Sequence, residues 1–369
     1  MGVPFLDLKA QFATIREDVL AQVARVFDEQ AFVLGKYVEG FEQDAARYLG
    51  TKHAIGISNG SDALLLALMA AGIKPGDEVI VPAFTFFATA GAVARLNAKP
   101  VFCDVEQDSF NIDLQDAAKR VTPRTRAIIP VDLYGQCADM EGVMDLARGH
   151  NLVVVEDAAQ AFGATRNGKQ AGTFAHYGCY SFYPTKNLGG AGDGGMIASD
   201  DDELADRIRL LRVHGERPRY YNKQVGICGR LDALQAVVLQ VKLKHLDAWN
   251  KRRAEIAQAY NRHLEGSKAL TPPVMKGNSH IYHQYTIRVG GGKRDALAAH
   301  LGGKGIGCGV YYPVPLHLQE CFREHGGKKG DLPASEALCA EALSLPVFDQ
   351  MTDAQVKEVA DAVLSFLRA

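Results

Sequence analysis

The stretch from Leu152 to Asp157, LVVVED, decides the fold class because four apolar residues in a row lead into two carboxylates. An apolar run without alternation is typical of a strand in a parallel sheet that helices cover on both faces. The runs DEVIVP, KPVFCDV and RAIIPVD precede it between residues 77 and 132 and alternate with amphipathic stretches. This βαβ succession predicts an α/β fold with a mostly parallel central sheet, in which ligands bind at the carboxyl ends of the strands.

The second half of the chain predicts a change of domain near residue 245. Residues 230–264 place apolar side chains at the three-and-four spacing of one long helix. Beyond it, QYTIRV and CGVYYPV are predicted strands, and Thr352 and Gln355 have the spacing of a capping box at the start of a terminal helix. We expect a large domain over residues 1–245 and a small C-terminal α/β domain over residues 246–369, with an N-terminal helix that can pack on the small one.

Composition excludes several classes of protein. The 41 basic and 43 acidic residues leave a net charge of −2 without a basic block, which argues against nucleic acid and anionic membranes as partners. No apolar run approaches the roughly 18 residues of a membrane span, and the N-terminus lacks the order of a signal peptide, so we expect a cytoplasmic protein. The seven cysteines and eleven histidines show no ligand spacing, and no metal site is expected.

Lys186 stands out because it lies in YSFYPTKNLGGAGDGG, residues 180–195, where a predicted strand gives way to tightly turning backbone. Asp157 ends another predicted strand, where its carboxylate either faces a cation or caps a helix over AAQAF. The stretch SNGSDAL, residues 58–64, opens an apolar helix whose N–H groups and Ser61 hydroxyl suit an anion such as phosphate. The alternative for this stretch is an ordinary helix cap.

Aromatic residues after a third strand complete the pattern. Phe84, Phe86 and Phe87 follow DEVIVP and either stack on a planar ring or pack in the core, and Ser181 offers a second hydroxyl. A phosphate site, a stacking ring, a strand-end carboxylate and a lysine, in that chain order, are what pyridoxal 5′-phosphate (PLP) requires. Lys186 is therefore the predicted lysine of the Schiff base.

Five stretches, SNGSDAL, VPAFTFFATA, VEDAAQAFGA, YSFYPTKNLGGAGDGG and YYPVPLHLQ, closely resemble the DegT/DnrJ/EryC1/StrS family of sugar aminotransferases. The resemblance covers nearly the whole chain. It implies a fold-type I PLP enzyme that moves an amino group from glutamate, leaving 2-oxoglutarate, to a keto-sugar attached to a nucleoside diphosphate. It also implies a homodimer whose two active sites lie at the subunit interface.

The resemblance further implies a role for particular residues. Lys186 and Asp157 are the catalytic pair, with Asp157 against the ring nitrogen and Lys186 on the aldehyde. The other implied cofactor contacts are Gly60, Ser61, Phe86, Gln160, Ser181 and Cys228. The implied substrate-side residues are His214, Arg230, Tyr311, Tyr312 and His317. Cys228 departs from the family, which commonly has asparagine there, in the segment VGICGRLDALQ that the family inserts into the partner's site.

Two further stretches, TPRTRAIIPVDLYGQCADM and HGERPRYYNKQVGICGRLD, resemble enzymes that make 3-amino sugars from UDP-linked 3-keto-hexuronates for surface polysaccharide such as O-antigen. A dTDP-linked 3- or 4-keto-6-deoxyhexose is the alternative substrate. A dehydratase branch of the family has histidine in place of the lysine, and Lys186 argues against it. A non-catalytic regulatory relative is the remaining alternative, against which the presence of both Lys186 and Asp157 argues.

Overall fold

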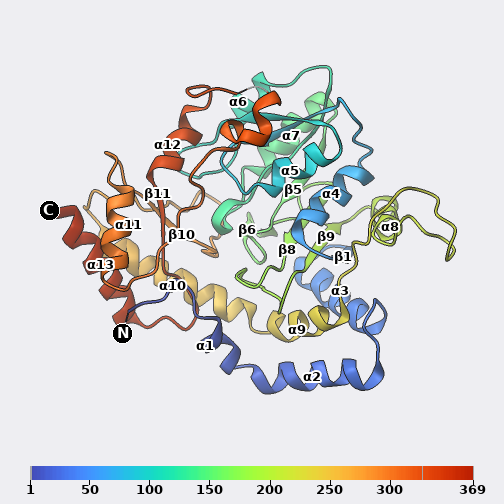
Figure 1. The fold of residues 1–369 in the computed structure, drawn as a ribbon, viewed down its shortest axis with the longest axis horizontal. Coiled ribbons are helices and arrows are strands. Elements are labelled where there is room, and N and C mark those ends of the chain that lie inside the picture. Colours follow the sequence, from blue (N-terminus) through green and yellow to red (C-terminus); the bar gives the residue numbers. More distant parts are fainter. Residues whose placement is uncertain (1, 326, 369) are drawn as a thin grey trace.

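A seven-stranded sheet forms the centre of this computed structural model, which describes residues 2–325 and 327–368 (Figure 1). In spatial order the strands are β1 (His53–Ile57), β9 (Gly195–Ser199), β8 (Tyr177–Ser181), β5 (Val153–Asp157), β4 (Thr125–Ile128), β2 (Glu78–Pro82) and β3 (Lys99–Cys103). The strands from β8 to β3 are parallel, and β9 runs antiparallel to both of its neighbours. The predicted α/β fold with a mostly parallel sheet is confirmed.

Helices cover both faces of the sheet, as its apolar strands require. The helices of the first 245 residues are α1 (Leu8–Ala13), α2 (Arg16–Glu29), α3 (Lys36–Leu49), α4 (Gly60–Ala70), α5 (Ala88–Arg95), α6 (Leu114–Lys119), α7 (Met140–His150), α8 (Asp202–Leu211) and α9 (Ala233–Leu243). α4 is buried along nearly its whole length because α5 and α8 pack on its outer side. α3 and α9 belong to a separate core on the sheet, together with Tyr180 and Phe182. No described helix has the length and apolarity that a membrane crossing needs.

Residues between 256 and 367 form, together with Val3, a core away from the seven-stranded sheet, which we call the second core. Its elements are α10 (Leu246–Leu264), β10 (Tyr285–Arg288), α11 (Arg294–Gly303), β11 (Ala342–Leu345) and α13 (Asp353–Arg368). α12 (Pro333–Glu341) instead packs through Leu338 and Cys339 in a smaller cluster with Phe84. Short elements complete the chain: β6 (Thr165–Arg166), β7 (Lys169–Gln170), and the 3₁₀ turns η1 (Leu133–Gly135), η2 (Leu316–Leu318) and η3 (Glu320–His325). The division into residues 1–245 and 246–369 stays a prediction.

The single long helix predicted over residues 230–264 is wrong, because the chain breaks it into α9 and α10 at Lys244 and His245. There the His245 N–H bonds the Lys242 carbonyl three residues back, 2.9 Å away, instead of continuing the α-helical pattern. α9 buries its side chains in the core beside the sheet, whereas Ile256 and Tyr260 of α10 lie in the second core. Leu246 at the start of α10 still lies in the core of α9, so the break falls where the chain passes from one core to the other.

The strand predicted over CGVYYPV is also wrong. Only Gly309 pairs there, in an isolated bridge with Ser344. Pro313 and Pro315 have no N–H with which to extend a ladder. The predicted strand QYTIRV does form, as β10, which pairs with β11.

The terminal helix α13 begins with the predicted capping box. The Thr352 N–H donates to Gln355 Oε1 at 2.9 Å, and the Gln355 N–H donates to Thr352 Oγ1 at 3.2 Å. Two otherwise unpaired donors at the helix start are thereby satisfied.

The N-terminal segment packs on the second core. The Gly307 N–H donates to the Val3 carbonyl at 2.8 Å, and Gln11 Nε2 of α1 donates to Asp349 Oδ1 at 3.1 Å. In Figure 1 the two chain ends accordingly lie near one another beside α13.

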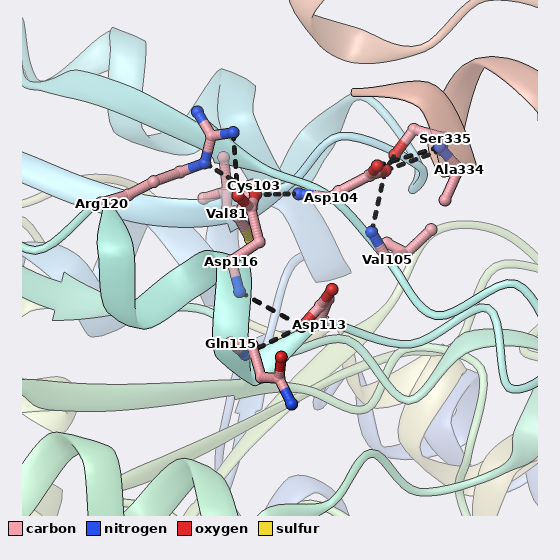
Figure 2. Close-up of polar contacts among 10 residues, drawn as sticks. All are labelled: Val81, Cys103, Asp104, Val105, Asp113, Gln115, Asp116, Arg120, Ala334 and Ser335. Carbon is pink, nitrogen blue, oxygen red and sulfur yellow. Dashed lines mark hydrogen bonds and ion pairs between the residues drawn. The ribbon is translucent and has the colours of Figure 1, made fainter. Parts of the chain in front are cut away.

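Asp104 connects the end of β3 to the start of α12 (Figure 2). Its carboxylate accepts hydrogen bonds from the N–H groups of Ala334 and Ser335 at 2.9 and 2.7 Å and from the Ser335 hydroxyl at 2.6 Å. The residue before α12, Leu332, has no capping side chain of its own. A strand-end carboxylate from elsewhere in the chain therefore caps this helix and holds it against the sheet.

Candidate active site

A cavity of about 620 Å³ opens where five strands end at their carboxyl termini. Residues that follow β1, β2, β4, β5 and β8 line it together with residues near β10. The predicted site residues that it brings together are Gly60, Ser61, Phe86, Asp157, Gln160, Ser181, Lys186, Tyr311 and Tyr312. They come from five separate stretches of the chain, and the strand-end rule for parallel sheets explains why most of them meet.

Lys186 reaches the cavity from a tight loop between β8 and β9. A Cβ at Gly189 would lie 2.3 Å from the Pro184 carbonyl oxygen, so the loop closes this tightly only with glycine there. The buried Lys242 of α9 donates from Nζ to the Gly189 carbonyl at 2.7 Å and so fixes the loop to α9. The glycines that follow the lysine thus serve to place it.

The electrostatic environment prepares Lys186 for proton transfer. Burial lowers the pKa of Lys186 to about 8, and the negative charge of Asp157 opposes that shift. Within the part of the chain that the structure describes, no group hydrogen-bonds its Nζ. The amine is therefore available in both its neutral and its charged form near neutral pH.

Asp157 points into the same cavity from the end of β5. Its Oδ2 accepts from Thr89 Oγ1 at 2.8 Å, and its Oδ1 accepts from the Ala159 N–H at 3.2 Å. Burial raises the pKa of Asp157, while the Thr89 hydrogen bond, the Ala159 hydrogen bond and the Lys186 charge act against that rise. No helix begins after Asp157, so the alternative of an N-cap is wrong. A buried carboxylate without an ion-pair partner among the described residues suits the cationic nitrogen of a bound ring.

The start of α4 and the end of β8 form the predicted phosphate site. Asn59 caps the helix by accepting from the Asp62 N–H at 2.8 Å, which leaves the Ser61 hydroxyl free of that task. A Cβ at Gly60 would lie only 2.7 Å from the Ser181 Cβ, so glycine lets the two segments approach. Helix N–H groups and the hydroxyls of Ser61 and Ser181 surround one end of the cavity, as a phosphate requires.

The three phenylalanines after β2 divide between the two roles predicted for them. Phe84 is buried and packs against Tyr134, with ring centroids 6.5 Å apart, so it belongs to the core. Phe87 stacks on Phe322 at 5.4 Å. Phe86 is 54% exposed and lines the cavity, where its face is free to cover a planar ring.

Gln160 and Tyr312 form a fixed wall of the cavity. Gln160 Oε1 accepts from the Tyr134 N–H at 2.8 Å, and its Nε2 donates to the Tyr312 hydroxyl at 3.1 Å. The Tyr312 ring lies 6.0 Å from that of Phe86. Both side chains are thus held in place by contacts within the protein.

His283 is a cavity residue that the sequence reasoning missed. Asn187 Nδ2 donates to Asn250 Oδ1 at 2.7 Å and to the Ile281 carbonyl at 3.1 Å, which orients its Oδ1 toward His283 Nδ1, 3.2 Å away. Because Asn187 Oδ1 can only accept, His283 Nδ1 carries the proton and Nε2 is an acceptor. Burial and the charges of Lys186 and Arg253 hold the pKa of His283 well below its usual range, so the ring is neutral.

Position in the sequence alone could have drawn attention to His283 and its neighbour Gln284, since His283 directly precedes the predicted strand QYTIRV and Gln284 is its first residue. Other cavity residues that were not predicted follow strands or flank Lys186: Asn59, Leu64, Thr85, Ala88, Val131, Ala159, Tyr183, Thr185 and Asp193.

Four predicted residues lie outside this cavity. His214, Cys228 and Arg230 belong to the segment after α8, whose loop projects from the body of the molecule in Figure 1, while Arg230 itself pairs with Ile57 at the end of β1. Arg230 Nη2 lies 3.1 Å from the Cys228 sulfur. His317 is buried with its Nε2 3.2 Å from Glu336 Oε1. The roles predicted for these four residues stay predictions. For the segment after α8, the predicted role is to enter the active site of a partner subunit.

Comparisons with known proteins agree with this geometry. Residues 13–364 match the DegT/DnrJ/EryC1/StrS aminotransferase family. A pleiotropic regulatory protein of Geobacillus stearothermophilus is 50% identical over 100% of this chain and 99% of its own. A UDP-N-acetyl-3-dehydro-α-D-glucosamine 3-aminotransferase of Acidithiobacillus ferrooxidans is 42% identical over 98% and 97%. The crystal structure of DesV from S. venezuelae, in complex with a ketimine intermediate, superposes with a TM-score of 0.97 at 42% identity, covering 100% of this chain and 99% of that one.

Proposed function

Because the chain belongs to the DegT/DnrJ/EryC1/StrS aminotransferase family, we propose that it transfers the amino group of glutamate to C3 of a keto-hexose attached to a nucleoside diphosphate. Membership makes it a PLP-dependent sugar aminotransferase. The observation that carries the proposal is the meeting of Lys186 and Asp157 in one cavity, where burial gives the lysine a pKa of about 8.

The residues of the cavity fit PLP. Gly60, Ser61 and Ser181 would hold the phosphate of the cofactor, and a Cβ added at Gly60 would lie 2.7 Å from the Ser181 Cβ. Phe86 would cover the ring, and Asp157 would face the ring nitrogen. When bound, PLP supplies an aldehyde that takes up the amino group and a ring that accepts an electron pair.

The chain's own groups then handle the protons. With the cofactor bound, a neutral Lys186 amine would remove the proton from Cα of the amino donor, and the resulting ammonium would be the proton source for the return step. The Asp157 carboxylate would favour the protonated form of the ring nitrogen. The neutral His283 ring adds no positive charge that would oppose the ammonium.

The acceptor is a UDP-linked 3-keto sugar, and the hexuronate is the preferred member of that class. The name of the Acidithiobacillus ferrooxidans relative supports both UDP and the 3-position. The preference for the hexuronate rests on sequence resemblance and on Arg230, whose guanidinium would pair with the uronate carboxylate. A dTDP-linked 3- or 4-keto-6-deoxyhexose is the competing acceptor.

The reaction is best tested in reverse, with a panel of nucleotide-linked amino sugars and 2-oxoglutarate as the acceptor. The panel needs UDP-linked 3-amino-hexuronate, its neutral 3-amino counterpart, and dTDP-linked 3-amino and 4-amino sugars. We expect glutamate to form fastest from a UDP-linked 3-amino sugar, and Lys186→Ala to abolish it. Preference for a 4-amino sugar, or no glutamate from any member, would overturn the assignment.

A regulatory role without catalysis is the second candidate, because the Geobacillus stearothermophilus relative is named as a regulatory protein. The two candidates differ in a simple spectrum. An aminotransferase converts its bound cofactor to the amine form when glutamate is added, which bleaches the aldehyde-derived absorbance, and the Lys186→Ala variant should not complete that conversion. A wild-type protein that binds the cofactor but ignores glutamate and every amino sugar would favour the regulatory role.

We further propose a homodimer with shared sites, in which the segment after α8 enters the partner's cavity. Lys186→Ala and Arg230→Ala homodimers should each be inactive or weak. Co-expressed with different tags, about half of the dimers are mixed, each with one intact site, and activity should recover to roughly a quarter of wild type. Verified heterodimers without recovery would refute shared sites and leave the lysine chemistry standing.

A further inference from the structure

A second cavity of about 280 Å³ adjoins the active-site cavity. The two share four lining residues: Thr185, His283, Gln284 and Tyr311. The remaining walls of the second cavity are Phe5, Leu6 and Val347, which are apolar, and Arg253. A ligand in the active site can therefore extend into a small, mostly apolar chamber that contains one cation.

Arg253 lacks an anionic partner in this chamber. It is 3% exposed, and its Nη1 donates to the carbonyls of Tyr282 and Val347 at 3.2 and 2.9 Å. No described group hydrogen-bonds its Nε or Nη2, and no described carboxylate lies within 4 Å. The charge of Asp349 acts on it from farther away, and that carboxylate accepts hydrogen bonds from Gln11 and Gln350.

A buried cation without a partner is unfavourable, and proteins usually pair such groups. Burial lowers the pKa of Arg253 to about 10, so the guanidinium stays charged at neutral pH. Nε and Nη2 form one edge of the guanidinium, the edge that binds a carboxylate through two parallel hydrogen bonds. Beside it, Gln284 Oε1 is buried without a partner, and the amide can present its NH₂ to the same anion when turned over.

We propose that Arg253 binds a carboxylate of the amino donor, which makes the second cavity the donor's carboxylate subsite. The inference rests on the proposed aminotransferase function and names where the amino acid is held. The chamber is too small for a nucleoside diphosphate, whereas its apolar walls suit the methylene groups of glutamate. The carboxylate of the proposed hexuronate is assigned to Arg230, so the amino donor and the nucleotide-sugar, which react in separate half-reactions, would depend on Arg253 unequally.

The test compares Arg253→Lys and Arg253→Met with the wild-type holoenzyme. Glutarate, a dicarboxylate that has no amino group to transfer, probes binding through the absorbance of the bound cofactor. Single-turnover reactions then measure the glutamate and amino-sugar halves separately. We expect both variants to lose at least tenfold in glutarate affinity and in the glutamate half-reaction, and the amino-sugar half-reaction to change less than twofold.

Two further variants keep the test decisive. Leu6→Trp narrows the chamber from its apolar wall without touching the guanidinium, so it should also weaken glutarate binding even if Arg253→Met does not fold. Arg252→Met is the matched control, because its neighbouring guanidinium pairs with Asp353 at 2.7 Å outside the chamber, and it should bind glutarate as the wild type does.

Equal losses in the two half-reactions would show that Arg253 only supports the backbone carbonyls of Tyr282 and Val347, and would overturn the subsite. Unchanged glutarate binding in the Arg253 and Leu6 variants would overturn it as well. A wild-type protein that does not react with glutamate or with any amino sugar would instead refute the proposed function. Glutarate binding to the wild type and the Arg253 variants would still show whether Arg253 binds a carboxylate.

Discussion

Replacing Asp157 with asparagine should increase the neutral fraction of Lys186 and at the same time lower the turnover of the enzyme. With a pKa of about 8, Lys186 is neutral in about one molecule in ten at pH 7. An ordinary lysine, of pKa 10.5, would be neutral in about one in 3,000, so burial enlarges the reactive fraction roughly 300-fold. The Asp157 carboxylate is the charge that opposes this effect. Asp157→Asn should therefore lower the pKa of Lys186 further while removing the partner of the ring nitrogen.

The assay measures cofactor-free protein first. Covalent attachment of PLP needs the neutral amine, so its rate, followed by absorbance between about pH 6 and 10, should reach half its maximum near pH 8 in wild type. In Asp157→Asn that midpoint should move to lower pH. Steady-state turnover of the complete reaction should fall at least about a hundredfold, because an amide cannot keep the ring nitrogen protonated.

Thr89→Val is the control, since it removes the 2.8 Å hydrogen bond to Asp157 but keeps the carboxylate. Its attachment midpoint should stay closer to wild type than that of Asp157→Asn. A wild-type midpoint near 10.5 would refute the buried amine. An unchanged midpoint in Asp157→Asn would show that the two groups do not interact, and near-normal turnover would show that Asp157 does not serve the ring.

Four other substitutions test the surrounding structure. Gly60→Ala would bring a methyl group to 2.7 Å from the Ser181 Cβ and should weaken PLP binding at least about tenfold by titration. Gly149→Ala would add a methyl group with nothing within 4 Å and should raise the free energy of unfolding by about 0.5–1 kcal/mol. Burial and a neighbouring carboxylate raise the pKa of Asp132 well above its usual value, so wild type should lose stability as pH rises from the ordinary aspartate range through that raised value. Urea unfolding of Asp132→Asn should show a smaller loss over the same range, and an equal slope would contradict the assignment. Asp104→Ala removes the cap of α12 and should lower the free energy of unfolding by about 2–4 kcal/mol, and a loss below about 0.5 kcal/mol would show that the cap is dispensable.

Local pattern was enough to predict the sheet and the chemical centre. The apolar runs that became β2, β3, β4 and β5 cannot be stable unless both faces are covered, so their sequence already requires a parallel sheet with helices on each side. Strands of such a sheet end at one edge, which is why Asp157 and Lys186 could be expected to meet. The Thr352 capping box is likewise a contact between residues three apart and depends on nothing distant.

Contacts between segments far apart in the chain were beyond such patterns. Periodicity could not reveal the break at His245, because the same apolar spacing continues from α9, which packs beside the sheet, into α10, which goes on into the second core. Periodicity also could not predict that Phe86 rather than Phe84 lines the cavity. Both residues follow the same strand, and only tertiary packing decides which ring is buried.

The unpaired guanidinium of Arg253 is the clearest case of what the tertiary structure alone decided. In the sequence it is one of two adjacent arginines on an amphipathic helix. In the fold, Arg252 reaches a surface carboxylate, while Arg253 is buried beside the active site without one. Side chains of neighbouring helical residues point about 100° apart, so burial and the identity of the partner depend on what packs against each face of the helix.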